Sequence, residues 1–192
     1  MVPEGSISET NFRRGFLAQF TGPQAADLVF RHEYERFCRD WSARHGWPLF
    51  LPPSPGDAHL LDTVRLPVTD SQAELDEQIG HLAKLLVDAL NEAELAKRVE
   101  RVPDGAKGIA KLEAFLEAIR FSQRESVIQY LRDLQTLRST GTAHRKGSAY
   151  EKILVKLGME ATRKPEAMRR LLEEGTATLR SLSCELCEPD AG

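Results

Sequence analysis

A short basic segment carries the residue types that could do chemistry. It begins at Leu137, ends at Gly147 and reads LRSTGTAHRKG. Arg138 is a permanent cation, and His144 has the one side chain whose unperturbed pKa lies near neutrality. A histidine can act as general base toward a ribose 2′-hydroxyl, and a guanidinium can stabilise the charge that grows on the phosphoryl oxygens. This pairing predicts cleavage of RNA, a reaction for which no metal ion or other cofactor is obligatory.

The residues around this pair suit a nucleic-acid substrate. Ser139 is expected to orient Arg138 or the phosphate. Residues 120–170 contain twelve basic and five acidic side chains, a net charge of +7, whereas the whole chain has a formal net charge of −3. The field at a surface follows the charge within a Debye length of about 8–10 Å, so the local excess matters more than the total. We expect four cations to hold the RNA backbone: Arg145, Lys146, Lys152 and Lys156.

Helical geometry limits how Arg138 and His144 can meet. Six residues at ~100° each place the two side chains about 120° apart around a helix axis. Gly141 disfavours a helix, and Ser139, Thr140 and Thr142 compete for its backbone hydrogen bonds. Either the helix breaks or kinks here, or a second copy of the chain completes the site.

The elements that must position this segment are predicted to be helices. Ser71 and Glu74 form a capping-box pattern in front of the first apolar stripe. Few β-branched runs alternate with a period of two, so a sheet is not expected. The sequence predicts an all-α antiparallel bundle of four to five helices over residues 69–183. Its stripes lie at helical spacing over 75–90, 109–119, 127–137, 153–157 and 168–182.

A proline-rich break precedes the bundle at 51–56, which reads LPPSPG. Before it, four aromatic residues repeat at steps of 4, 3 and 4 on a helix expected from about Pro23 to His45, where they form either core or a docking surface. The predicted organisation is a helical extension over 1–56, a connector over 57–68, the bundle over 69–183 and a flexible tail over 184–192. The aromatic residues are Phe30, Tyr34, Phe37 and Trp41.

The segment and its setting resemble the HEPN superfamily, helical domains with an R-x4-6-H motif that include many metal-independent endoribonucleases of toxin–antitoxin, abortive-infection and CRISPR systems. Arg138-Ser139-x4-His144 matches this motif, including the polar residue after the arginine. The resemblance covers about 69–183. It implies a homodimer in which Arg138 and His144 of both chains meet RNA in a shared cleft, and a possible antitoxin or regulatory partner. Lys146 stands where nucleotidyltransferase-paired toxins of this superfamily have a tyrosine, so that subgroup is not indicated.

Other site types find little support. Arg36 stands where a zinc-protease helix starting at His32-Glu33 would need its second histidine. Cys184-x-x-Cys187 is half of a zinc site with no second pair after it, so no metal is expected. No P-loop, dinucleotide or nucleophile-elbow motif is present. No apolar run reaches the ~20 residues of a membrane span and the N-terminus lacks a secretory core, so we expect a cytoplasmic protein with reduced cysteines that does not enter a membrane.

An alternative function uses the same elements without catalysis. Many members of the superfamily have lost catalysis and act as dimerisation or nucleotide-sensing modules. In that case the aromatic face of 30–41 and the basic face would bind a protein partner. This hypothesis predicts an exposed apolar patch, and a fully buried aromatic stripe would count against it.

Overall fold

The computed structural model describes residues 25–100, 105–141, 148–158 and 163–187, together with the side chains of all of these except 141 and 148–151. Within these ranges the regular structure is helical, and an isolated bridge between Phe50 and Leu90 is the one β interaction. The predicted all-α fold class is confirmed. The elements are α2 (Ala26–His45), the 3-10 turn η1 (Pro55–Asp57), α3 (Leu60–Thr63), α4 (Gln72–Ala83), the π-helix η2 (Lys84–Asp88), α5 (Glu92–Ala96), α6 (Gly108–Ala118), α7 (Arg124–Gly141), α8 (Ser148–Lys156) and α9 (Lys164–Leu186).

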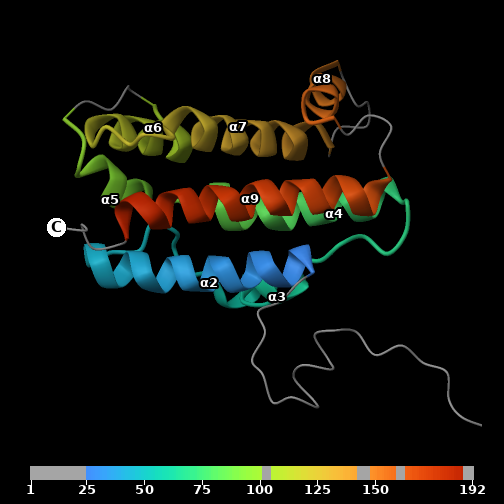
Figure 1. Cartoon of the computed structure of the whole chain (residues 1–192), viewed down its shortest axis with the longest axis horizontal. Coiled ribbons are helices and arrows are strands. Elements are labelled where there is room, and N and C mark those ends of the chain that lie inside the picture. The colour runs from blue at the N-terminus through green and yellow to red at the C-terminus, as the bar shows by residue number, and fades with distance from the viewer. Residues whose placement is uncertain (1–24, 101–104, 142–147, 159–162, 188–192) are drawn as a thin grey trace, which may run out of the picture.

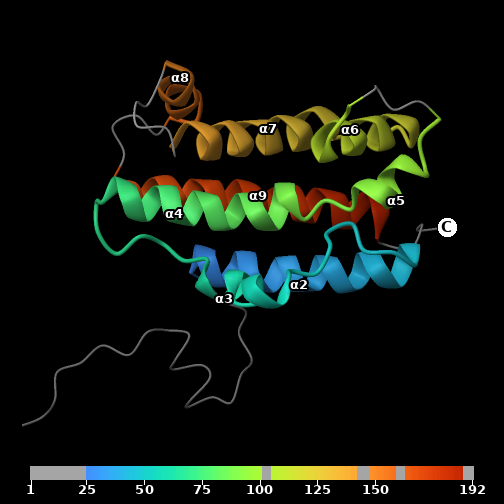
Figure 2. The same ribbon diagram turned by 180° about the vertical axis from the view of Figure 1, so that it is seen from behind.

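The long helices form three layers, which Figures 1 and 2 show from opposite sides. Helices α6 and α7 make one outer layer, α4 and α9 the middle layer, and α2 with α3 the other outer layer. Helix α8 lies across the end of α7. In the described ranges no helix is both long and apolar enough to span a membrane.

The helices do not all alternate in direction. Along α2 and α9, Phe30 lies beside Gly175, and His45 bonds the carbonyl of Leu186, so these two helices are parallel. The start of α4 also lies beside the start of α9. Helix α7 is antiparallel to α9, because its early residue Tyr130 bonds Leu171 while Ser122, just before α7, bonds Glu185. The long segment between α2 and α4 returns the chain to the same end of the bundle, which is why these neighbours run in one direction.

Local sequence explains most of the helix ends. Helix α4 begins directly after Ser71 as predicted, but the reciprocal capping-box bonds are absent there. The Ser71 side chain makes no cap bond, and the Glu74 carboxylate accepts instead from the backbone N–H and hydroxyl of Thr69. Gly46 and Gly158 follow α2 and α8 with positive φ, the left-handed conformation that glycine adopts without strain.

One hydrophobic core joins both sides of the proline-rich segment. The four aromatic residues of α2 expose between 0% and 6% of their surface and pack in one cluster with residues of α4, α6, α7 and α9. The aromatic stripe is therefore core and not a docking surface. The segment predicted as connector includes α3, with Leu60 buried, and α9 extends three residues past the predicted bundle end at 183, placing Cys184 on a helix.

Candidate functional site

Arg138 lies in the last turn of α7 and forms an ion pair with Asp88. Helical side chains lean toward the N-terminus of their helix, so the guanidinium reaches back along α7 to the end of η2. The Arg138 side chain exposes 29% of its surface and that of Asp88 exposes 48%. Such a pair is reachable by a ligand and fixes the direction of the guanidinium.

Asp88 belongs to a π-helix, where the N–H of Ala89 bonds the carbonyl of Lys84 at 3.0 Å across five residues. π-Helical turns inside or beside α-helices occur frequently at functional sites. Lys84 and Asp88, at the two ends of this turn, are exposed on the protein surface. Leu85, Leu86 and Val87, between them, are buried in the core. The sequence pattern predicted this stretch only as the end of an amphipathic helix.

The hydroxyl residues after Arg138 bond back onto their own helix. Ser139 Oγ donates to the carbonyl of Thr136 at 3.1 Å, and Thr140 Oγ1 donates to the same carbonyl at 2.6 Å. Helix α7 nevertheless continues to Gly141. These residues compete for backbone bonds as expected, but the helix remains continuous through them.

The remaining predicted site residues fall into two groups. His144, Arg145 and Lys146 lie outside the described residues. On α8, Lys152 is exposed, whereas Lys156 Nζ lies 2.5 Å from Asp133 Oδ2. Since Asp133 is buried on α7, this ion pair holds α8 against α7.

A cavity of about 430 Å³ opens between α6 and α7 on one side of the Arg138–Asp88 pair. We call it the α6–α7 cavity. Its cationic lining residues are Lys107, Arg132 and Arg138, and Asp88 and Glu92 supply negative charge. Arg132 pairs with Glu113 at 2.5 Å, outside this lining. The cavity thus places two further cations, Lys107 and Arg132, near the predicted catalytic arginine, together with two carboxylates.

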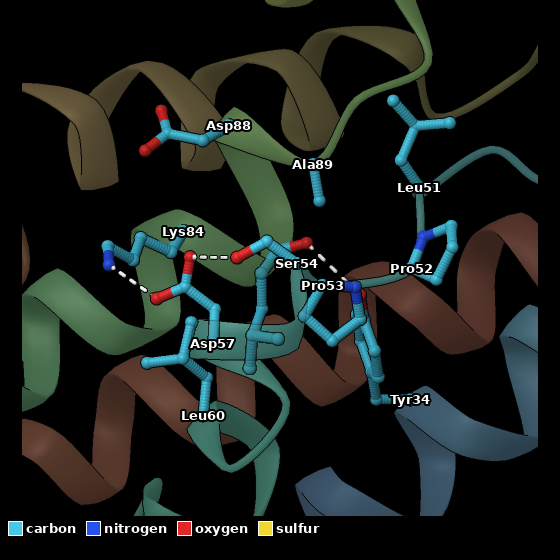
Figure 3. Close-up of a pocket in the computed structure, with 11 residues that line it drawn as sticks. Tyr34, Leu51, Pro52, Pro53, Ser54, Asp57, Leu60, Lys84, Asp88 and Ala89 are labelled. Atoms are coloured by element: carbon cyan, nitrogen blue, oxygen red, sulfur yellow. Dashed lines mark hydrogen bonds and ion pairs between the residues drawn. The ribbon is translucent and has the colours of Figure 1, made fainter.

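A second cavity, of about 280 Å³, lies on the other side of Asp88 (Figure 3). We call it the Pro-loop cavity, because the proline-rich segment forms one wall and η2 the opposite wall. The two cavities share Asp88, so a ligand that spans them passes the Arg138–Asp88 pair. Its lining residues are Tyr34, Leu51, Pro52, Pro53, Ser54, Asp57, Leu60, Lys84, Leu85, Asp88 and Ala89.

Asp57 is the fixed polar group of this second cavity. Its carboxylate accepts from Lys84 Nζ at 3.0 Å and from Ser54 Oγ at 3.0 Å, and Figure 3 shows both side chains directed at it. These hydrogen bonds lower the pKa of Asp57, so the group is ionised at neutral pH. Tyr34 Oη donates to the carbonyl of Leu85 at 3.3 Å, which ties the cavity floor to η2.

Sequence reasoning missed Asp57, Lys84 and Asp88. The proline-rich segment, predicted as a break before the bundle, forms a cavity wall. Lys84 and Asp88 lie on the polar side of an ordinary amphipathic pattern, and nothing in that pattern separates them from solvent-facing charges. An aspartate two residues after a proline–serine–proline turn is the only local signal, and it is weak.

Comparison of this chain with protein-family models, with curated proteins and with solved structures finds no match. In the described part of the chain, no group of three or more His, Cys, Asp or Glu side chains could hold a metal ion.

Proposed function

We propose that this chain is a metal-independent endoribonuclease that acts as a homodimer, as the HEPN-like motif implies. The observation that carries the proposal is the position of Arg138. Its guanidinium is partly exposed, oriented by Asp88, and shares the α6–α7 cavity with Lys107 and Arg132. A phosphate that enters this cavity meets three cations, and charge-assisted hydrogen bonds to guanidinium groups are among the strongest contacts a phosphate makes.

The proposed roles follow from side-chain chemistry. His144 takes the proton of the ribose 2′-hydroxyl or donates one to the leaving oxygen. Arg138 stabilises the negative charge that develops on the phosphoryl oxygens, and Ser139 helps to orient it. Arg145, Lys146 and Lys152 bind the backbone, and such contacts give affinity with little sequence information. Lys156 contributes to the site indirectly, since its ion pair with Asp133 fixes α8.

The decisive assay incubates the chain with total RNA in EDTA. We expect cleavage by the unmodified chain and a loss of about 100-fold or more in rate for His144→Ala. Arg138→Lys keeps the charge but loses the planar fork, so we expect partial loss of rate, and larger loss for Arg138→Ala. Arg39→Ala removes an exposed arginine from α2, far from α7, and is the matched control. Intact RNA, or equal cleavage by His144→Ala, would refute the proposal.

A second candidate is a non-catalytic helical module that dimerises or binds a regulatory protein. The two ion pairs that engage Arg138 and Lys156 favour it, because both neutralise cations assigned to RNA. Burial of the aromatic stripe removes the docking surface that this function would have used on α2. Absence of cleavage together with a concentration-dependent dimer in sedimentation experiments would support this candidate.

A further inference from the structure

The Pro-loop cavity has the size and the lining of a site for a small ring. Its walls are mostly apolar: Leu51, Pro52, Pro53 and Leu60 line it, and Ala89 lies beside Leu51, whose backbone N–H donates to the Ala89 carbonyl at 2.6 Å. The volume of about 280 Å³ is near the lower limit of the ~300–1,000 Å³ typical of small-molecule sites, so the cavity suits a ring system and not an extended ligand. The cavity opens to the protein surface, because its lining residues Leu51, Pro52 and Pro53 are exposed. A ring that is attached to a polymer can therefore enter it from solvent.

The polar groups at the rim determine which ring fits. Two carboxylates, Asp57 and Asp88, line the cavity and are hydrogen-bond acceptors, and Lys84 donates to Asp57. Asp88 bonds Arg138 through Oδ2, and each carboxylate oxygen can accept more than one hydrogen bond. A ligand that matches this rim presents donors to the carboxylates and an acceptor to the ammonium group.

Among the RNA bases, guanine presents that pattern most fully. Its ring N–H and exocyclic amine lie side by side and can donate two hydrogen bonds to one carboxylate, while its carbonyl oxygen accepts. Cytosine and adenine each offer one exocyclic amine without the adjacent ring donor. Uracil presents two acceptors around one donor and would leave a carboxylate facing a carbonyl oxygen, two acceptors with no hydrogen between them.

We propose that the Pro-loop cavity is a nucleobase subsite selective for guanine, next to the phosphate site at Arg138. The proposal rests on the proposed function for its substrate class, RNA. A base seated against the prolines and Ala89 lies on one side of Asp88, and its phosphate lies on the other side in the α6–α7 cavity. Single-stranded RNA is recognised in this way, by bases turned out of the stack and read along their hydrogen-bonding edges.

Binding is measured with the full chain, in EDTA, against the four ribonucleoside monophosphates by isothermal titration. We expect GMP to bind at least about tenfold more tightly than UMP, the discrimination of one good two-bond pairing. Asp57→Asn replaces one acceptor oxygen by a donor and should remove most of this preference. Ala89→Leu fills the cavity and should weaken binding of GMP about tenfold or more. Asp62→Asn, an exposed carboxylate on α3 outside the cavity, is the matched control and should retain the preference.

A second measurement separates this proposal from the proposed function. The sites of RNA cleavage are mapped for the unmodified chain and for Asp57→Asn, after circular dichroism confirms that both are folded. Guanine next to the cleaved bonds, lost in the variant, supports the subsite. RNA cleavage without GMP preference, or with a pattern unchanged by Asp57→Asn, overturns the subsite and leaves the nuclease standing. GMP-selective binding that Asp57→Asn abolishes, without RNA cleavage, supports the subsite and refutes the nuclease.

Discussion

Gly175 on α9 lies against residues of both α7 and α2, and its replacement by alanine tests this packing. An added Cβ would lie 2.7 Å from Tyr130 Oη on α7 and 3.2 Å from Phe30 Cε2 on α2. Neither group can move away easily. Phe30 is fully buried, and the Tyr130 hydroxyl is tied to the carbonyl of Leu171 at 2.9 Å. A methyl group at this position must displace a buried ring.

The expected magnitude combines opposing effects. Gly→Ala inside a helix favours folding by about 1 kcal/mol when the space is open. Overpacking a filled core disfavours it by about 1–3 kcal/mol, and strain on a buried hydrogen bond adds about 0.5–1.5 kcal/mol. The free energy of unfolding of Gly175→Ala should therefore fall by about 1–3 kcal/mol. For a chain of this length, each kcal/mol corresponds to about 2–4 °C in Tm.

The assay is urea unfolding with Gly80→Ala as the matched control. Gly80 lies inside α4, and nothing stands within 4 Å of its added Cβ, so this variant should be as stable as the unmodified chain or up to about 1 kcal/mol more stable. Tyr130→Phe removes the clashing oxygen. Combined with Gly175→Ala it should cost less than the sum of the two single changes. A Gly175→Ala chain as stable as Gly80→Ala, or strict additivity with Tyr130→Phe, would refute the packing described here.

Three further predictions concern folding and pH. The pKa of Glu174 is raised, chiefly because its carboxyl group is partly desolvated and also because the Asp133 carboxylate lies nearby, while Lys156 opposes the shift. Folding therefore disfavours the charged form of this group. The stability that this group contributes is present below the ordinary glutamate pKa and is lost as pH rises through the raised value. Glu174→Gln should therefore raise the free energy of unfolding at pH 7.5 by less than about 1 kcal/mol, and by much less at pH 4, in urea unfolding at the two pH values. Trp41→Ala should cost about 3–5 kcal/mol in urea unfolding, and Leu28→Ala, on the exposed side of the same helix, under about 0.5 kcal/mol; equal costs would contradict the orientation of α2. Asn91→Ala should cost about 2 kcal/mol, because its side chain both accepts from the N–H of Glu94 at the start of α5 and donates to the carbonyl of Pro48; Asn91→Asp, which keeps the acceptor, should cost less.

Periodicity predicted the long helices well because burial on one face is a local pattern. The stripes over 75–90, 109–119, 127–137 and 168–182 became α4 with η2, α6, α7 and α9. The same pattern could not separate α4 from the π-helix that follows it, since both bury the same side. Short loops led to the prediction that neighbouring helices are antiparallel, but α2 and α9 run parallel because the long segment after α2 returns the chain to the same end. The short helices α3 and α5 carry too few turns for a stripe to be visible.

The candidate site was predicted only in part. Arg138 stood out because a cation, small hydroxyls and a histidine occur together in the sequence. Its partner Asp88 is fifty residues away, and an exposed aspartate on an amphipathic helix carries no mark of that pairing. The partner of Lys156 is equally invisible in the sequence: the buried carboxylate of Asp133 lies 2.5 Å from its Nζ. The prediction that Lys156 contacts RNA stays a prediction.

The helical class, the long helices and the basic segment can be predicted from the sequence, because hydrophobic periodicity is a pattern of neighbours along the chain and charge belongs to each residue type. The aromatic stripe as core, the proline-rich segment as a cavity wall and the position of Asp88 between two cavities are visible only in the folded chain. Those features depend on which distant segments pack together. Which distant segments pack together depends on how their side chains jointly fill one close-packed core, and a local sequence pattern contains no information on that packing.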